Sequence, residues 1–93
     1  MSHVALRVRV TGTVQGVFFR AWTAEQARAL GVTGWVRNAR DGSVEAHLQG
    51  EKWAVQQLVD LLHRGPPSAE VDQVTVEEAD TAAAAAGTFE VRH

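Results

Sequence analysis

Strand-like and helix-like patterns follow one another along this chain in the order strand, helix, strand, strand, helix, strand. The clearest of them lies in residues 51–63, where apolar side chains recur at i, i+3, i+4 and i+7, the spacing of an amphipathic helix. The other expected elements are strands at residues 4–11, 32–38, 43–49 and 71–78, a helix at residues 21–30 and a short last strand at residues 89–92. Two crossover units joined by one hairpin are typical of the split βαβ, or ferredoxin-like, arrangement. We therefore predict an α+β sandwich, with an antiparallel sheet, two helices on one face, and a short C-terminal strand at a sheet edge.

Length and composition limit the organisation and the chemistry of the chain. Its 93 residues suit one modest core, so residues 1–93 are expected to form a single domain. The absence of cysteine excludes disulfides, thiolate metal sites and a cysteine nucleophile. A formal charge of −2 gives no general attraction to nucleic acid or to an anionic membrane. Because neither a secretory signal nor an apolar run of spanning length is present, we expect a cytoplasmic, soluble monomer with no nucleic-acid or membrane partner.

The junction between the first strand and the first helix is the candidate functional segment. Residues 12–20 read Gly-Thr-Val-Gln-Gly-Val-Phe-Phe-Arg, and the two glycines permit backbone conformations that other residues resist. The first N–H groups of a helix lack intrahelical partners and carry partial positive charge, so such a turn can bind an anion. Residues 15–19 contain no Ser, Thr, Asp or Asn to cap the helix, and the dipole disfavours a cation at the position of Arg20. The alternative is an ordinary turn with a solvated Arg20, followed by a helix that starts at a capping box from Thr23 to Gln26.

Asn38 is the second candidate, because the predicted hairpin brings it toward the same end of the sheet. In a split βαβ sheet the first and third strands are central neighbours, so the end of the second strand and the exit of the first can meet. A neutral carboxamide there could hold a water beside a bound phosphate, whereas a carboxylate would repel the anion. The alternative is that Asn38 caps the hairpin through an Asx turn.

Two motifs resemble the signatures of the acylphosphatase family. The first is Gly12-x-Val14-Gln15-Gly16-Val17-x-Phe19-Arg20, and the second is Gly34-Trp35-Val36-Arg37-Asn38 followed by Asp41-Gly42-Ser43-Val44 and ending at Gly50. They occur in the family's order and spacing, and the resemblance runs over nearly the whole chain. It implies hydrolysis of a small-molecule acyl phosphate to a carboxylate and inorganic phosphate, with no metal, no cofactor and no covalent phosphoenzyme.

The resemblance also implies roles for individual residues. In the family, the arginine that matches Arg20 and the loop amides bind the phosphate, and the asparagine that matches Asn38 orients the attacking water. The implied substrate-binding residues are Gln15, Gly16, Val17, Phe18, Phe19 and Arg20. The chain departs from the family at one position, because many members carry Thr after the asparagine and this chain has Ala39. Loss of that hydroxyl is expected to affect the rate rather than the reaction.

Other residues support competing interpretations. The histidines lack the ligand spacing of a metal site and are expected to be solvated; they are His3, His47, His63 and His93. Trp22, Trp35 and Trp53 could form a stacking platform for RNA, but the aromatic and basic pattern of such proteins is absent, so packing is favoured. The main alternative to an enzyme is a ferredoxin-like module that binds a phosphate or carboxylate ligand without catalysis. A further alternative is the acylphosphatase-like region at the start of larger carbamoyl-transferring maturation proteins.

Overall fold

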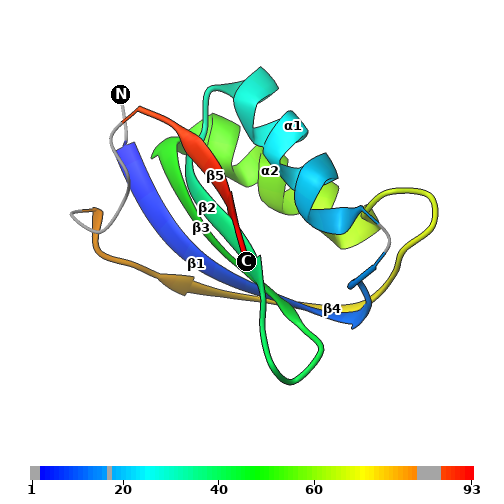
Figure 1. Cartoon of the computed structure of the whole chain (residues 1–93). Coiled ribbons are helices and arrows are strands. Elements are labelled where there is room, and N and C mark those ends of the chain that lie inside the picture. The colour runs from blue at the N-terminus through cyan, green and yellow to red at the C-terminus, as the bar shows by residue number, and fades with distance from the viewer. Residues whose placement is uncertain (1–2, 17, 82–86) are drawn as a thin grey trace.

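The computed structural model describes residues 3–16, 18–81 and 87–93, and its elements lie within two residues of the expected ones. The elements in chain order are β1 (His3–Thr13), α1 (Phe19–Leu30), β2 (Thr33–Asn38), β3 (Val44–Glu51), α2 (Lys52–Arg64), β4 (Glu70–Glu78) and β5 (Phe89–Arg92). The strands form one sheet in the order β4-β1-β3-β2-β5. Both helices cover the same face of this sheet (Figure 1), as the α+β prediction required. The predicted fold class is therefore confirmed.

The sheet is mixed, whereas the sequence predicted an antiparallel one. The pairs of β1 with β3, β1 with β4 and β2 with β3 are antiparallel, but β5 lies parallel to β2 at the sheet edge. The direction of β5 follows from the topology. Because β4 runs opposite to β2, a strand that follows β4 after one reversal must run in the direction of β2. The edge position of the last strand was predicted correctly.

Helix α1 begins earlier than its sequence pattern indicated, at Phe19 instead of residue 21. Its N-cap residue is Phe18, whose carbonyl accepts a hydrogen bond from the Trp22 N–H at 2.9 Å. Thr23 lies inside the helix with a fully buried side chain, and its hydroxyl has no hydrogen-bond partner among the described residues. The alternative start at a Thr23 capping box is therefore wrong, because a capping hydroxyl would accept a backbone N–H.

Replacing Thr23 by valine is expected to raise the free energy of unfolding. A buried hydroxyl without a partner costs about 1–3 kcal/mol of desolvation, and valine has the same shape without that group. We expect a gain of about 1 kcal/mol in urea denaturation, with no change in the denaturant slope. A loss of about 1 kcal/mol would instead indicate that Thr23 caps the helix.

The hydrophobic core fills the space between the sheet and the two helices. It includes the helix residues expected to face inward, with Ala24 and Ala27 of α1 and Leu58 of α2 fully or almost fully buried. Phe19, the first residue of α1, is only 1 % exposed and anchors the start of the helix in this core. The junction between β1 and α1 is thus fixed by packing at its helical end.

The opposite face of the sheet is polar but not uniformly solvated. His47 was predicted to be solvated on this face, and that prediction is wrong because its side chain is fully buried. Its ring stacks on Trp35 at a centroid distance of 6.3 Å, and three guanidinium groups lie within 5.0 Å of the Trp35 ring centroid. These belong to Arg7, Arg37 and Arg92. Trp35 is consequently 5 % exposed, which removes it as a stacking platform.

Candidate functional site

Three separate segments meet in one pocket at the end of the sheet where β1 and β2 finish. The pocket has a volume of about 360 Å³ and is lined by the turn after β1, the start of α1, the last residue of β2 and the end of β5. Its lining residues are Val14, Gly16, Phe18, Phe19, Arg20, Ala21, Asn38, Val91 and His93. Both predicted catalytic residues, Arg20 and Asn38, are among them. Of the predicted loop residues, Gly16, Phe18 and Phe19 line the pocket, and Val17 lies outside the described residues.

The two glycines of the first motif have different structural roles. Gly12 belongs to β1 at a register irregularity, and a side chain there would collide with the Glu70 carbonyl of β4, because a Cβ would lie 2.2 Å from its oxygen. Gly16 instead forms the turn, with a φ of 73°, and has open space around it. Only Gly16 therefore shapes the pocket directly.

The start of α1 presents main-chain N–H groups without a side-chain cap. Among the residues that the structure describes, no side-chain hydrogen bond caps the helix, and the first turn holds no acidic residue. Phe18 has left-handed backbone angles of φ 61° and ψ 21°, and it is the only non-glycine residue in the described ranges with a positive φ. Such a turn directs successive amides toward one side. The positive end of the helix dipole adds to the field at this point.

Strand β5 orients the guanidinium of Arg20. Its Nη1 donates to the carbonyl oxygen of Arg92 at 2.9 Å and lies 3.2 Å from Nδ1 of His93. A guanidinium has five N–H donors in a fixed fork, so contacts at Nη1 set the direction of the whole group. Arg20 is half-buried, which limits the freedom of its stem. Figure 1 shows the end of β5 reaching the place where β2 ends, next to the β2–β3 loop.

Sequence reasoning missed the contribution of β5. His93 was expected to be a solvated terminal residue, yet it lines the pocket and contacts Arg20. The Arg92 carbonyl had no sequence signal at all, because every residue has a carbonyl. The short strand signal at residues 89–92 could have suggested proximity only if the pairing of β5 with β2 had been known.

The side chain of Gln15 makes structural contacts beside the role that the motif implied for its main-chain amide. Its side-chain Nε2 donates to the carbonyl oxygens of Ala39 and Ser43, both at 2.9 Å. Gln15 thereby ties the turn after β1 to the β2–β3 hairpin, and it is not among the residues that line the pocket. Asn38 directly precedes Ala39, so this contact fixes the position of Asn38 relative to the turn.

If the pocket hydrolyses an acyl phosphate, as the family resemblance implies, we expect Gln15→Met to lower kcat about tenfold. Removing both hydrogen bonds lets the hairpin shift against the turn, and small misplacements are costly in catalysis. The substitution keeps the length of the side chain. Thr33→Val is the matched control, since it removes a hydrogen bond from Thr33 Oγ1 to Gln49 O in the same sheet but away from the pocket. Steady-state kinetics of both variants show whether the hydrogen bonds of Gln15 affect kcat. Equal effects of the two substitutions would show that Gln15 contributes only stability.

Asn38 lines the pocket and carries a buried acceptor. Its Oδ1 is buried and has no hydrogen-bond partner within the part of the chain that the structure describes. The alternative role of Asn38 as an Asx cap of the hairpin is therefore wrong. Asp41 fills that role, since its Oδ1 accepts from the Ser43 N–H at 3.0 Å and from the Ser43 hydroxyl at 2.6 Å. A buried acceptor without a partner is uncommon in proteins and marks a place where an additional donor can bind.

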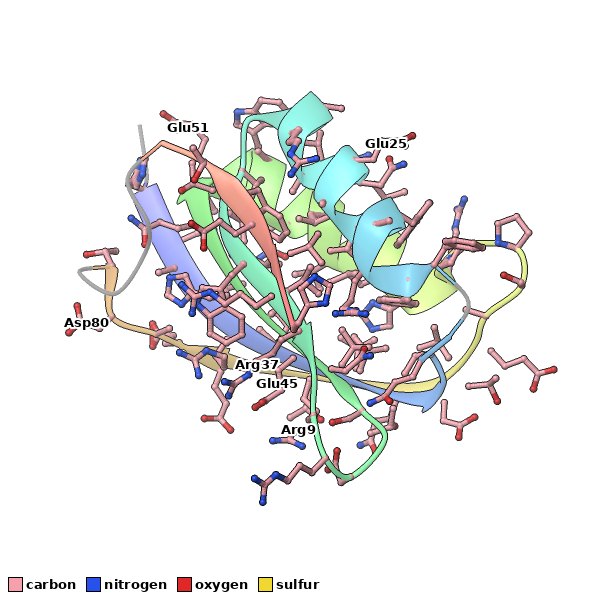
Figure 2. All side chains as sticks on the ribbon, viewed as in Figure 1. Arg9, Glu25, Arg37, Glu45, Glu51 and Asp80 are labelled. Atoms are coloured by element: carbon pink, nitrogen blue, oxygen red, sulfur yellow. The ribbon has the colours of Figure 1, made fainter. Side chains whose placement is uncertain are left out.

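Charged side chains around the hairpin hold it in place. The two hydrogen bonds from Ser43 lower the pKa of the Asp41 carboxyl below its ordinary value of 3.8, and the nearby Arg9 guanidinium acts in the same direction. Arg9 also pairs with Glu45 at 3.0 Å, and Glu45 pairs with Arg37 at 3.0 Å. Figure 2 shows Arg9, Glu45 and Arg37 gathered on the face of the sheet away from the helices. These contacts brace β2 and β3 just where Asn38 enters the pocket.

No group of three or more His, Asp or Glu side chains that could hold a metal ion occurs in residues 3–16, 18–81 and 87–93. Within the same residues, no helix has both the length and the apolar character that crossing a membrane requires.

Comparisons with known proteins agree on one family. The model of the acylphosphatase family matches residues 6–91. An acylphosphatase from Rubrobacter xylanophilus is 56 % identical over 94 % of this chain and 78 % of its own length. One from Anaeromyxobacter dehalogenans is 53 % identical over 98 % of this chain and 97 % of its own length. The solved structure of an acylphosphatase from Coxiella burnetii superimposes with a TM-score of 0.90 at 39 % identity, over 97 % of this chain and 93 % of that one.

Proposed function

Because this chain belongs to the acylphosphatase family of enzymes, we propose that its pocket binds the phosphoryl group of an acyl phosphate and directs a water molecule onto the phosphorus. The observation that carries this proposal is the convergence of the uncapped start of α1, Arg20 and Asn38 on one pocket. Arg20 belongs to the first turn of α1, whereas Asn38 is the last residue of β2, so the meeting of Asn38 with the start of α1 is a property of the fold.

The main-chain amides of residues 15–19 and the guanidinium of Arg20 bind the phosphate in this proposal. Phosphoryl transfer passes through a loose transition state, so catalysis depends mainly on positioning and on stabilising the equatorial oxygens. An arginine can donate to two of these oxygens at once, in bonds roughly twice as strong as neutral hydrogen bonds. The contacts of Arg20 with β5 support this role, because they orient the fork before the substrate arrives.

Asn38 orients the attacking water. An Oδ1 acceptor can take one hydrogen bond from the water, which leaves an oxygen lone pair free to point at phosphorus. The place of Asn38 on the pocket lining supports this role, as does the lack of a partner for Oδ1 among the described residues. Because the carboxamide is neutral, it does not repel the phosphate beside it.

The proposed reaction needs no general acid on the leaving group. The water oxygen forms a bond to phosphorus as the bond between phosphorus and the acyl oxygen breaks. The acyl group leaves as a carboxylate, and both protons of the water end on the phosphate, which leaves as dihydrogen phosphate. Carboxylic acids ionise near pH 4, so the carboxylate leaves readily at neutral pH without protonation. The step involves neither a metal ion nor a covalent phosphoenzyme.

The proposal extends to the form in which the protein acts. We propose a monomer as the active form. A net charge of −2 favours a small-molecule substrate over nucleic acid. We propose the cytoplasm as the place of action.

The direct test is release of inorganic phosphate from benzoyl phosphate by the purified protein in the presence of EDTA. We expect release well above the rate of spontaneous hydrolysis, and the same rate with and without the chelator. Saturable binding of phosphate without any release from the acyl phosphate would favour the non-catalytic binding module instead. Loss of activity in EDTA would contradict the metal-free mechanism.

A further inference from the structure

Phe18 combines an unusual backbone conformation with an exposed aromatic side chain. It is 83 % exposed, although it lies beside Phe19, which is 1 % exposed and packs in the core. Its φ of 61° is one that a non-glycine residue rarely adopts. Because the ring packs against little of the protein itself, core packing does not explain why an aromatic residue stands at this strained position. Its position on the lining of the pocket points instead to a contact with the ligand.

The geometry of in-line attack assigns the acyl group to one side of the pocket. The attacking and leaving oxygens lie roughly opposite each other across phosphorus. If Asn38 holds the attacking water, as the proposed function states, the acyl group extends away from Asn38. Asn38 also lines a neighbouring hollow, and Phe18 is not among the residues of that hollow; its lining is Arg37, Asn38, Ala39, Arg40, Glu45 and His93. The acyl group therefore extends away from that hollow and into the main pocket, whose lining includes Phe18.

The main pocket has both the space and the surface for an apolar acyl group. Its volume of about 360 Å³ falls within the range of about 300–1,000 Å³ that is typical of small-molecule pockets, so it can hold more than a phosphoryl group. Apart from His93 and the residues that would bind phosphate and water, its lining is apolar, with Val14, Ala21 and Val91 beside the two phenylalanines. No Asp or Glu side chain lies among these described lining residues.

We propose that Phe18 is a specificity-determining residue that favours acyl phosphates with an apolar, and especially an aromatic, acyl group. This inference rests on the proposed function of the same pocket. The exposed ring offers a face against which such a group can stack. The contact forms only when the substrate is bound, which is consistent with the exposure of the ring in the free protein.

The main alternative to an apolar acyl group is an anionic one, because the neighbouring hollow contains arginine side chains. It holds Arg37 and Arg40, but Arg37 is already paired with Glu45 at 3.0 Å, and Glu45 itself lines the hollow. Part of its positive charge is therefore neutralised. The hollow also lies on the side of the attacking water, so a leaving acyl group would not enter it.

The test compares kcat/KM for benzoyl, acetyl and succinyl phosphate in the wild type and in Phe18→Ala. Intrinsic reactivity cancels when ratios are compared between proteins. We expect the ratio of benzoyl to acetyl phosphate to fall about three- to tenfold in Phe18→Ala, the size of one aromatic contact. Phe18→Leu, which keeps an apolar side chain, should retain more than half of the ratio. Trp53→Ala, which removes an aromatic side chain that is 66 % exposed on α2, should leave the ratio unchanged.

Phe18→Gly separates the side chain from the backbone. Glycine relieves the strain of a positive φ and alanine does not. If the ratio of benzoyl to acetyl phosphate falls equally in Phe18→Gly and Phe18→Ala, the missing ring is therefore the cause. An unchanged ratio in Phe18→Ala would overturn the inference. So would a wild-type preference for succinyl phosphate that disappears in Arg40→Ala. If the wild type releases phosphate from none of the three substrates, the proposed function fails, and this outcome is distinct from an unchanged ratio.

Discussion

Arg20→Ala is expected to lower kcat/KM for benzoyl phosphate by at least about 100- to 1000-fold, the usual effect of removing one preorganised donor to the transition state. Arg20 supplies the only guanidinium among the described residues that line the pocket, so no neighbour can take its place. The same substitution should weaken inhibition by inorganic phosphate, because the product occupies the same donors as the substrate. Steady-state kinetics with phosphate as a competitive inhibitor measure both effects.

Arg28→Ala provides the matched control for this variant. Arg28 lies on the same helix, and its Nη2 donates to the Phe89 carbonyl of β5 at 3.0 Å, much as Arg20 donates to the Arg92 carbonyl at 2.9 Å. Both substitutions therefore remove a bond between α1 and β5, but only Arg20 lines the pocket. A second variant, Arg20→Lys, keeps the charge without the fork and should recover only part of the activity. Near-normal turnover in Arg20→Ala would contradict the proposed phosphate site.

Asn38→Ala is expected to reduce kcat by at least about 100-fold while changing inhibition by phosphate much less. The carboxamide acts on the water in our account, so its loss should affect the chemical step more than the binding of the phosphoryl group. Asn38→Asp has nearly the same shape and should lose activity as well. In addition, its carboxylate should weaken phosphate inhibition, because like charges repel beside the bound anion.

The comparison of the two Asn38 variants decides between two possible roles. If Asn38 bound phosphate directly, the alanine variant would lose phosphate affinity in parallel with kcat. If Asn38 served only the hairpin, both variants would have lower stability and near-normal kcat. Urea denaturation distinguishes the second case, with Thr33→Val as a reference for the loss of one hydrogen bond within the sheet.

The order of the helices and strands could be predicted because local sequence patterns and global topology agree in this chain. The apolar spacing in α2 predicts the face that the structure buries, with Val55, Leu58 and Leu62 all inaccessible or nearly so. The start of α1 could not be located to the residue, because Phe18 and Phe19 give no capping signal and the helix begins through backbone and core contacts. The parallel direction of β5 depends on long-range pairing with β2, which a four-residue strand does not encode locally.

The candidate site was predictable where side-chain chemistry defines it and unpredictable where the main chain does. Arg20 and Asn38 were identified from their residue types, and the structure brings both to one pocket. The side chains of Gln15 and Arg20 donate to main-chain carbonyl oxygens. Every residue type has such an oxygen, so these partners could not be predicted from the sequence. Asp41, rather than Asn38, forms the Asx turn, and both residues suit that motif on sequence alone.

A crystal structure of the protein with bound phosphate tests the central claim most directly. We predict a tetrahedral anion at the start of α1, with its oxygens about 2.7–3.1 Å from main-chain nitrogens of the turn and from the Arg20 fork. We also predict an ordered water that donates to Asn38 Oδ1 and faces phosphorus. An empty turn with the anion bound elsewhere, or an anion in the turn with Arg20 and Asn38 directed away from it, would contradict the account.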